Sequence, residues 1–144
     1  MSIDIGSAAP GFDLTDGRGD RWGPVGGSAT VIVFTSASCP YARAWHDRLQ
    51  AVAHDYAPQG VRVGFVGVED PDGAAVATTY GATVTPEVFL LDGDGKLRYR
   101  GAPDADHEDE RQGARWLRNA LDTVLAGEPV VEAITQPVGC AIAG

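Results

Sequence analysis

The chain has 144 residues, a length at which a single domain over residues 1–144 buries about two thirds of its unfolded surface. Its net charge of −9, with only 11 basic residues, argues against nucleic acid and against an anionic membrane surface as partners. The apolar runs are too short to cross a bilayer, and the first residues lack the basic and apolar regions of a signal peptide. We therefore expect a soluble, cytoplasmic protein.

The two ends of the chain predict extensions of one central domain. Residues 1–28 predict a hairpin, because glycine-rich loops flank a short strand-like piece around Arg21-Trp22. Residues 128–144 predict a tail that contains a possible strand over 130–134 and then Cys140.

The sequence between these extensions begins with a βαβ pattern. The apolar, β-branched run over 30–36 predicts a buried strand, and apolar residues at helical spacing predict a helix over about 41–57. The helix is expected to stop near 58–60, and a second strand follows over 61–68. Because a crossover helix joins the two strands, we expect them to pair in parallel.

The second half predicts a helix, a hairpin and a helix. The helix start at Asp70-Pro71-Asp72 predicts a short helix to about Tyr80. Two strand patterns over 88–91 and 96–100 predict an antiparallel hairpin, and apolar residues on one face predict a helix over 116–125. The expected fold class is α/β, with a mixed central sheet flanked by helices.

We expect no metal and no cofactor, because the sequence contains no Cys/His cluster with metal-ligand spacing. His107 lies in the acidic run 104–110, which we interpret as the start of a helix, where carboxylates oppose the helix dipole. The turn 92–95 resembles the opening of a calcium loop. Lys96 occupies the next ligand position, so we interpret the segment as a hairpin turn.

Cys39 stands where the first predicted strand meets the first predicted helix, and Pro40 beside it suits a first helical turn. An isolated cysteine is more often a small buried hydrophobe. Here its sulfur is expected to face unpaired N–H groups and the positive end of the helix dipole. Both favour the thiolate, so we expect the pKa of Cys39 to lie below its usual value and interpret it as a reactive cysteine.

The element order, with Cys39 at the first strand–helix junction, resembles the thioredoxin fold. Thr85-Pro86 resembles the cis-proline segment that faces the active-site cysteine in that superfamily. Residues 9–14 resemble the entry segment of peroxiredoxins and of membrane-type thiol–disulfide reductases. The tail 136–142, together with Cys39-Pro40-Tyr41, resembles redoxin or peroxiredoxin-like members of the superfamily. We expect a cis Thr85–Pro86 bond, with the Thr85 backbone near Cys39 and available to an extended substrate.

Two positions depart from these families. Ala42 stands where thioredoxins carry a second cysteine, so the usual C-x-x-C dithiol cannot form. Ile32 stands where peroxiredoxins carry a proline, although Ser36 matches their hydroxyl residue. The resemblance implies a thiol-dependent oxidoreductase and leaves open whether its substrate is a disulfide or a peroxide.

Three functions are compatible with this pattern. In the favoured one, Cys39 attacks a protein or small-molecule disulfide or a peroxide, Cys140 resolves the intermediate, and a thiol donor restores the protein. Tyr41 and the nearby basic residues Arg43 and Arg48 are candidates to support this site through a hydrogen bond and positive potential. The alternatives are a redox-inert binding module and a one-cysteine peroxidase resolved by an external thiol, which gives Cys140 no role.

A further prediction concerns a bond between the two cysteines. Ala42 leaves Cys39 without a local partner, and Cys140 is the only other thiol in the chain. We therefore expect the two to form an intramolecular disulfide under mild oxidation.

Overall fold

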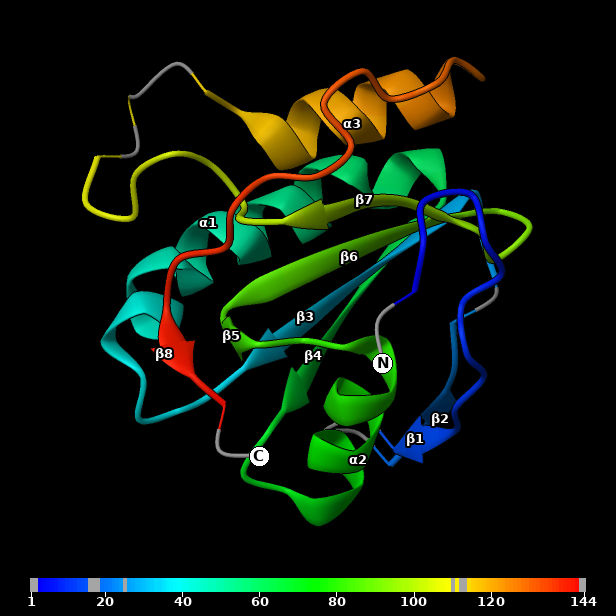
Figure 1. The fold of residues 1–144 in the computed structure, drawn as a ribbon. Coiled ribbons are helices and arrows are strands. Elements are labelled where there is room, and N and C mark those ends of the chain that lie inside the picture. The colour runs from blue at the N-terminus through cyan, green and yellow to red at the C-terminus, as the bar shows by residue number, and fades with distance from the viewer. Residues whose placement is uncertain (1–2, 16–18, 25, 110, 112–113, 143–144) are drawn as a thin grey trace.

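A four-stranded mixed sheet forms the centre of the computed structural model, which describes residues 3–15, 19–24, 26–109, 111 and 114–142 (Figure 1). One central strand pairs in parallel with one neighbour and antiparallel with the other, and a hairpin completes the sheet. This confirms the predicted parallel pair and hairpin. In spatial order the strands are β4 (Val61–Gly67), β3 (Ala29–Thr35), β6 (Glu87–Asp92) and β7 (Leu97–Gly101).

Helices cover both faces of this sheet. Helices α1 (Pro40–Tyr56) and α3 (Trp116–Leu125) lie on one face and α2 (Pro71–Tyr80) on the other (Figure 1). Successive residues of β3 alternate between two buried clusters, Val31 and Val33 packing with α1 and α3, and their neighbours with α2. Burial on both faces explains why the predicted strand is an unbroken apolar run.

The second helix begins and ends at the predicted signals. The carboxylate of Asp70 accepts a hydrogen bond from the Asp72 N–H at 3.1 Å, which caps the first turn of α2. Gly81 ends the helix at φ 75°, a left-handed conformation that glycine adopts without a side-chain penalty. After α1 the chain passes through the short 3₁₀ helix η1 (Ala57–Gln59) into β4. Among the described residues, none of the helices has the length and apolarity needed to cross a bilayer.

Two small antiparallel pairs flank the central sheet. The predicted N-terminal hairpin is confirmed as β1 (Leu14–Thr15) and β2 (Arg21–Trp22), with residues 16–18 outside the described residues. The second pair joins β5 (Val84–Thr85) to β8 (Cys140–Ala141), which lies in the C-terminal tail. Figure 1 shows the tail passing along the β7 edge before it reaches β5.

The expected strand over 130–134 is wrong. Val131 is fully exposed, and residues 130–134 form only an isolated bridge, between Ile134 and Arg100. The backbone N–H of Arg100 donates to Ala133, and its carbonyl accepts from Thr135. Residues 130–133 do not continue this parallel contact along the preceding residues of β7, so no ladder forms over 130–134.

The interpretation of the acidic run 104–110 as a helix start is also wrong. Its described residues form a loop, and α3 begins later, at Trp116. Asp104 is buried because its carboxylate accepts hydrogen bonds from the Trp45 indole at 2.9 Å and from Arg48 at 2.7 Å. These partners on α1 hold the run against that helix.

Candidate active site

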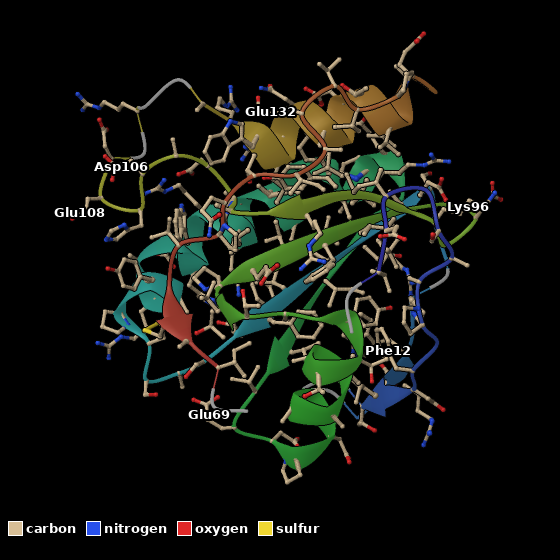
Figure 2. The ribbon with its side chains drawn as sticks, viewed as in Figure 1. Phe12, Glu69, Lys96, Asp106, Glu108 and Glu132 are labelled. Atoms are coloured by element: carbon tan, nitrogen blue, oxygen red, sulfur yellow. A yellow bond between two sulfur atoms is a disulfide. The ribbon has the colours of Figure 1, made fainter. Side chains whose placement is uncertain are left out.

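A disulfide joins Cys39 and Cys140, whose Cα atoms lie 6.0 Å apart although 101 positions separate them in the sequence. Figure 2 shows it as the yellow bond between the start of α1 and β8. Cys39 is the residue immediately before the first turn of α1, and Pro40 is the first residue of that helix, as predicted. The structure therefore brings together the two cysteines whose proximity the sequence left open.

The sulfur of Cys39 lies in a buried position at the positive end of α1. Cys39 is 2% exposed, and no acidic residue lies in the first turn of the helix. Its backbone carbonyl accepts the N–H of Arg43 at 3.0 Å, which fixes the cysteine against the helix N-terminus. An anion formed on this sulfur would face the unpaired N–H groups of the first turn.

The Thr85–Pro86 peptide bond is cis and Thr85 contacts Cys39, as predicted, whereas the availability of Thr85 to an extended substrate stays a prediction. The Cys39 sulfur lies 3.2 Å from the Thr85 carbonyl oxygen. A disulfide sulfur carries no proton, so in this state the pair is a close contact, whereas a free thiol would donate a weak hydrogen bond there. Thr85 also stands opposite Cys140 in the β5–β8 register. One backbone position thus touches both cysteines.

A hollow of about 280 Å³ adjoins the disulfide. Apart from the two cysteines and Thr85, its lining is formed by small hydroxyl and aliphatic side chains and one carboxylate, with no cationic group among the described lining residues. These residues are Ser36, Ser38, Val68, Glu69, Ala141 and Ile142. Among the residues that the structure describes, no three His, Cys, Asp or Glu side chains are placed to hold a metal ion.

Glu69 holds the loop that leads to Cys39. Its carboxylate accepts hydrogen bonds from the Ser36 hydroxyl at 2.7 Å and from the Ala37 N–H at 2.9 Å. The Ser36 bond, with smaller contributions from backbone N–H groups, lowers the pKa of Glu69 below its ordinary value, against a small opposing effect of burial. Figure 2 shows Glu69 in the segment between β4 and α2.

Of the other predicted site residues, some lie beside the disulfide and others do not. Ser36 lines the hollow, whereas Tyr41 is half-buried with its ring centroid 4.6 Å from that of His107. Arg43 is exposed, and Arg48 pairs with Asp104. Tyr41, Arg43 and Arg48 are not among the residues that line the hollow beside the disulfide.

A buried ion pair positions the strand that faces Cys39, and the sequence analysis missed it. Glu87, 1% exposed, binds Arg100 at 3.0 Å and also accepts the Thr83 N–H at 2.9 Å. The available signal was a carboxylate directly after Thr85-Pro86 at the start of an apolar strand. Glu69 gave no comparable signal, because the loop it binds lies 32 positions away in the sequence.

Gly139 is a second residue that the sequence analysis did not single out. A Cβ built on it would lie 1.9 Å from the Thr85 carbonyl oxygen, a separation that no side chain can occupy. The tail therefore approaches Thr85 closely enough to place Cys140 on Cys39 only because this position is glycine.

The family model of the thioredoxin-like domain matches residues 25–110, more than half of the chain. The chain therefore belongs to the thioredoxin-like domain family, as its resemblance predicted, and its mixed α/β architecture agrees with that fold. The comparison with curated proteins gave no significant match.

Several solved structures are similar to this one. A hypothetical protein from Sinorhizobium meliloti is 28% identical, with a TM-score of 0.83 over 99% of this chain and 95% of that one. An uncharacterized conserved protein from Geobacillus kaustophilus is also 28% identical, with a TM-score of 0.83 over 98% and 92% of the two chains. The thioredoxin domain of a thiol-disulfide oxidoreductase from Bacteroides vulgatus is 20% identical, with a TM-score of 0.58 over 67% and 86%, and this likeness concerns the fold alone.

Proposed function

We propose that this protein is a thiol–disulfide oxidoreductase in which Cys39 is the nucleophile and Cys140 the resolving cysteine. The observation that carries the proposal is the disulfide between them, placed at the N-terminus of α1 and beside Thr85. The helix N-terminus stabilises the thiolate that attacks and the same thiolate when it leaves.

The reaction is two successive thiol–disulfide exchanges. The Cys39 thiolate attacks one sulfur of the substrate disulfide, forming a mixed disulfide and releasing the second substrate sulfur as a thiolate that takes up a proton. The Cys140 thiolate then attacks the Cys39 sulfur and releases the first substrate sulfur. The substrate disulfide gains two electrons, and the two protein thiols become the Cys39–Cys140 disulfide.

A thiol donor restores the reduced protein by two further thiol–disulfide exchanges. Cys39 is 2% exposed in the disulfide, whereas Cys140 is partly exposed, so the donor reaches the Cys140 sulfur more readily. Attack there breaks the bond toward Cys39, whose thiolate leaves toward the helix N-terminus. A second donor thiol then frees Cys140. The cytoplasmic location expected from the sequence stays a prediction, and a disulfide that is reversibly reduced fits that compartment.

The lining of the hollow favours a disulfide over a peroxide as substrate. Peroxide reduction forms a hydroxide or alkoxide leaving group, which a neighbouring cation stabilises. The described lining offers Glu69 and hydroxyl groups instead, and Arg43 is exposed on α1 away from it. The disulfide between Cys39 and Cys140 also argues against a one-cysteine peroxidase, because that mechanism would leave Cys140 without a role.

The test follows the fate of the two thiols. The reduced protein is mixed with an aromatic disulfide, and in parallel with hydrogen peroxide, and analysed by non-reducing peptide mapping. We expect the aromatic disulfide to release two aromatic thiols per chain and restore the Cys39–Cys140 bond, and Cys140→Ser to stop at a mixed disulfide on Cys39. Unreactive Cys39 would leave the redox-inert binding module as the better function. Faster oxidation by peroxide than by the disulfide would favour the peroxidase.

A further inference from the structure

The oxidised protein presents its disulfide to the hollow of about 280 Å³ that both cysteines line. Cys140 is partly exposed, whereas Cys39 is 2% exposed. The edge of β5 beside them is occupied, because Thr85 pairs with Cys140 and the Thr83 carbonyl accepts the N–H of Ile142 at 3.0 Å. A thiol that reduces the disulfide is therefore expected to approach through the hollow and to contact its lining.

The polar part of this lining consists of oxygen atoms and carries one negative charge. Glu69 is exposed, and its Oε2 atom accepts both the Ser36 hydroxyl at 2.7 Å and the Ala37 N–H at 2.9 Å. The Ser38 hydroxyl lies 3.1 Å from that of Ser36. A carboxylate has about four lone-pair sites, so Glu69 can accept a further hydrogen bond from a ligand. The described lining residues include no Lys, Arg or His that would oppose its charge.

These groups suit a cation beside the sulfur of the donor and disfavour an anion there. An ammonium group has three N–H donors and no acceptor, so it can bond to carboxylate and hydroxyl oxygens together. A carboxylate or sulfonate in the same place meets a like charge. The attacking thiolate is common to every donor, so the hollow distinguishes donors by the charge on the rest of the molecule.

We propose that Glu69 determines the specificity for the thiol donor, favouring a thiol that carries a cationic group a few atoms from its sulfur over one that carries an acidic group. This inference rests on the proposed function and specifies its reducing half. A small aminothiol and a protein cysteine flanked by lysine or arginine share this chemistry.

Glu69 acts on the approach of the donor and takes no part in the exchange of electrons. The donor thiolate attacks the Cys140 sulfur, the Cys39–Cys140 bond breaks, and Cys39 leaves as a thiolate. A second donor thiolate attacks the donor sulfur of the mixed disulfide, which forms the donor disulfide and releases Cys140 as a thiolate that takes up a proton. Two donor thiols lose two electrons in total, and the protein disulfide gains them. The charge of Glu69 should therefore change the rate of reduction and leave its products the same.

Three two-carbon thiols that differ in charge test this inference: cysteamine, which is cationic, 2-mercaptoethanol, which is neutral, and 2-mercaptoethanesulfonate, which is anionic. Each is added in excess to the oxidised full-length protein, and loss of the disulfide is followed by acid quenching, alkylation and intact-protein mass spectrometry. Each rate is compared between the parent protein and Glu69→Gln, so that the intrinsic reactivity of the thiol cancels. Relative to mercaptoethanol, we expect Glu69→Gln to slow cysteamine and to accelerate mercaptoethanesulfonate by about threefold each, as one solvent-screened charge allows.

Further variants separate the charge of Glu69 from its support of the loop. Glu128→Gln removes an exposed carboxylate that lines a different hollow, so it should leave the three relative rates unchanged. Ala141→Lys adds a cation to the exposed lining beside the disulfide without removing the bonds of Glu69, so mercaptoethanesulfonate should gain on cysteamine. Ala141→Gln, which adds length without charge, should not have this effect. Raising the ionic strength to about 1 M should reduce all these differences, because the Debye length falls to about 3 Å.

Two peptides distinguish a small donor from a protein donor. One pentapeptide has lysine on both sides of a single cysteine, and the other has glutamate in both places. Faster reduction by the lysine peptide, with the advantage lost in Glu69→Gln, would assign the donor to a protein with a basic cysteine segment. A charge preference confined to the two-carbon thiols would assign it to a small aminothiol.

Mercaptoethanol separates the two hypotheses. If it reduces the disulfide but Glu69→Gln changes the rates of all three thiols equally, Glu69 only supports the loop, this inference fails and the proposed function stands. If none of the thiols reduces the disulfide in the folded protein, the proposed function fails, and this inference fails with it.

Discussion

Glu69 and Ser36, 33 positions apart in the sequence, are joined by a 2.7 Å hydrogen bond that ties the end of β4 to the loop before Cys39. The same carboxylate accepts the Ala37 N–H. The strand–helix junction that carries the nucleophile is therefore held in place from the neighbouring parallel strand. Both residues also line the hollow beside the disulfide, so this bond shapes the approach to Cys39.

Replacing Glu69 should weaken the protein only where the carboxylate is ionised. The lowered pKa of Glu69 means that its contribution is present above the unfolded value of about 4.3 and is lost as the pH falls through the lower folded value. We expect Glu69→Gln to cost up to about 1 kcal/mol at pH 7, because the exposed carboxylate is screened by water. Thermal melting from pH 7 to pH 2 should show the two proteins converging at low pH. Glu128→Gln, which removes another exposed carboxylate, is the control and should show no such convergence.

The position of Cys39 at the start of α1 predicts an acidic thiol. We expect the alkylation rate of reduced Cys140→Ser protein to rise with a midpoint below about 8.5, the value for a free cysteine. The physical reason is the set of unpaired N–H groups in the first turn, where no acidic side chain opposes them. Alkylation by iodoacetamide, followed against pH by mass spectrometry, measures it. A midpoint at or above that of a model cysteine peptide would contradict the prediction and favour the binding module.

Oxidation should raise the melting temperature. The disulfide closes a loop of 101 residues, and restricting a loop of about a hundred residues in the unfolded chain stabilises the fold by up to ~4.7 kcal/mol in the entropy model. For a domain of this size we expect the oxidised protein to melt about 10 °C above the reduced one. Calorimetry with and without a dithiol reductant gives the difference. Cys140→Ser, which cannot close the loop, should melt at one temperature under both conditions, and an equal response of both proteins would refute the explanation.

The sequence predicted the parts of the fold that depend on local signals. The start of α2 at Asp70-Pro71 and its end at Gly81 are short-range features of the chain, and the structure confirms both. The βαβ order and the proline after Thr85 led to the family and to the cis bond beside Cys39. The predictions for residues 130–134 and for the acidic run 104–110 were wrong, because the conformation of both segments depends on contacts with residues far away in the sequence.

Contacts between residues far apart in the sequence also explain the features that the sequence did not predict. Asp104 belongs to a loop because Trp45 and Arg48 bind it, and no pattern near residue 104 indicates that. The tail forms its ladder at Cys140, which pairs with β5 and is bonded to Cys39, whereas residues 130–134 make only one bridge to β7. Single-sequence patterns carry no information on such contacts.

The buried pair Glu87–Arg100 should matter both for stability and for the site. Glu87 joins Arg100 to the Thr83 N–H, and the Thr83 carbonyl accepts from the tail, so the pair holds the strand on which the tail lies. Glu87→Gln keeps the shape but leaves the Arg100 charge, which is only 15% exposed, without a counter-charge, which we expect to cost about 3–5 kcal/mol in urea unfolding. Asp92→Asn is the matched control. It makes the same carboxylate-to-amide change in a pair whose arginine is 38% exposed, so it should cost about 1 kcal/mol or less.

The double variant Glu87→Met, Arg100→Met separates the two roles of the pair. It removes both charges, so its stability should recover most of the loss seen in Glu87→Gln. Thr83 then lacks the carboxylate that fixes its N–H, so the β5 edge loses its support. In the protein with both cysteines we therefore expect slower release of the second aromatic thiol, when Cys140 on the tail resolves the mixed disulfide, and an unchanged rate for release of the first. If both rates stay at those of the parent protein, the pair serves stability alone and does not position β5.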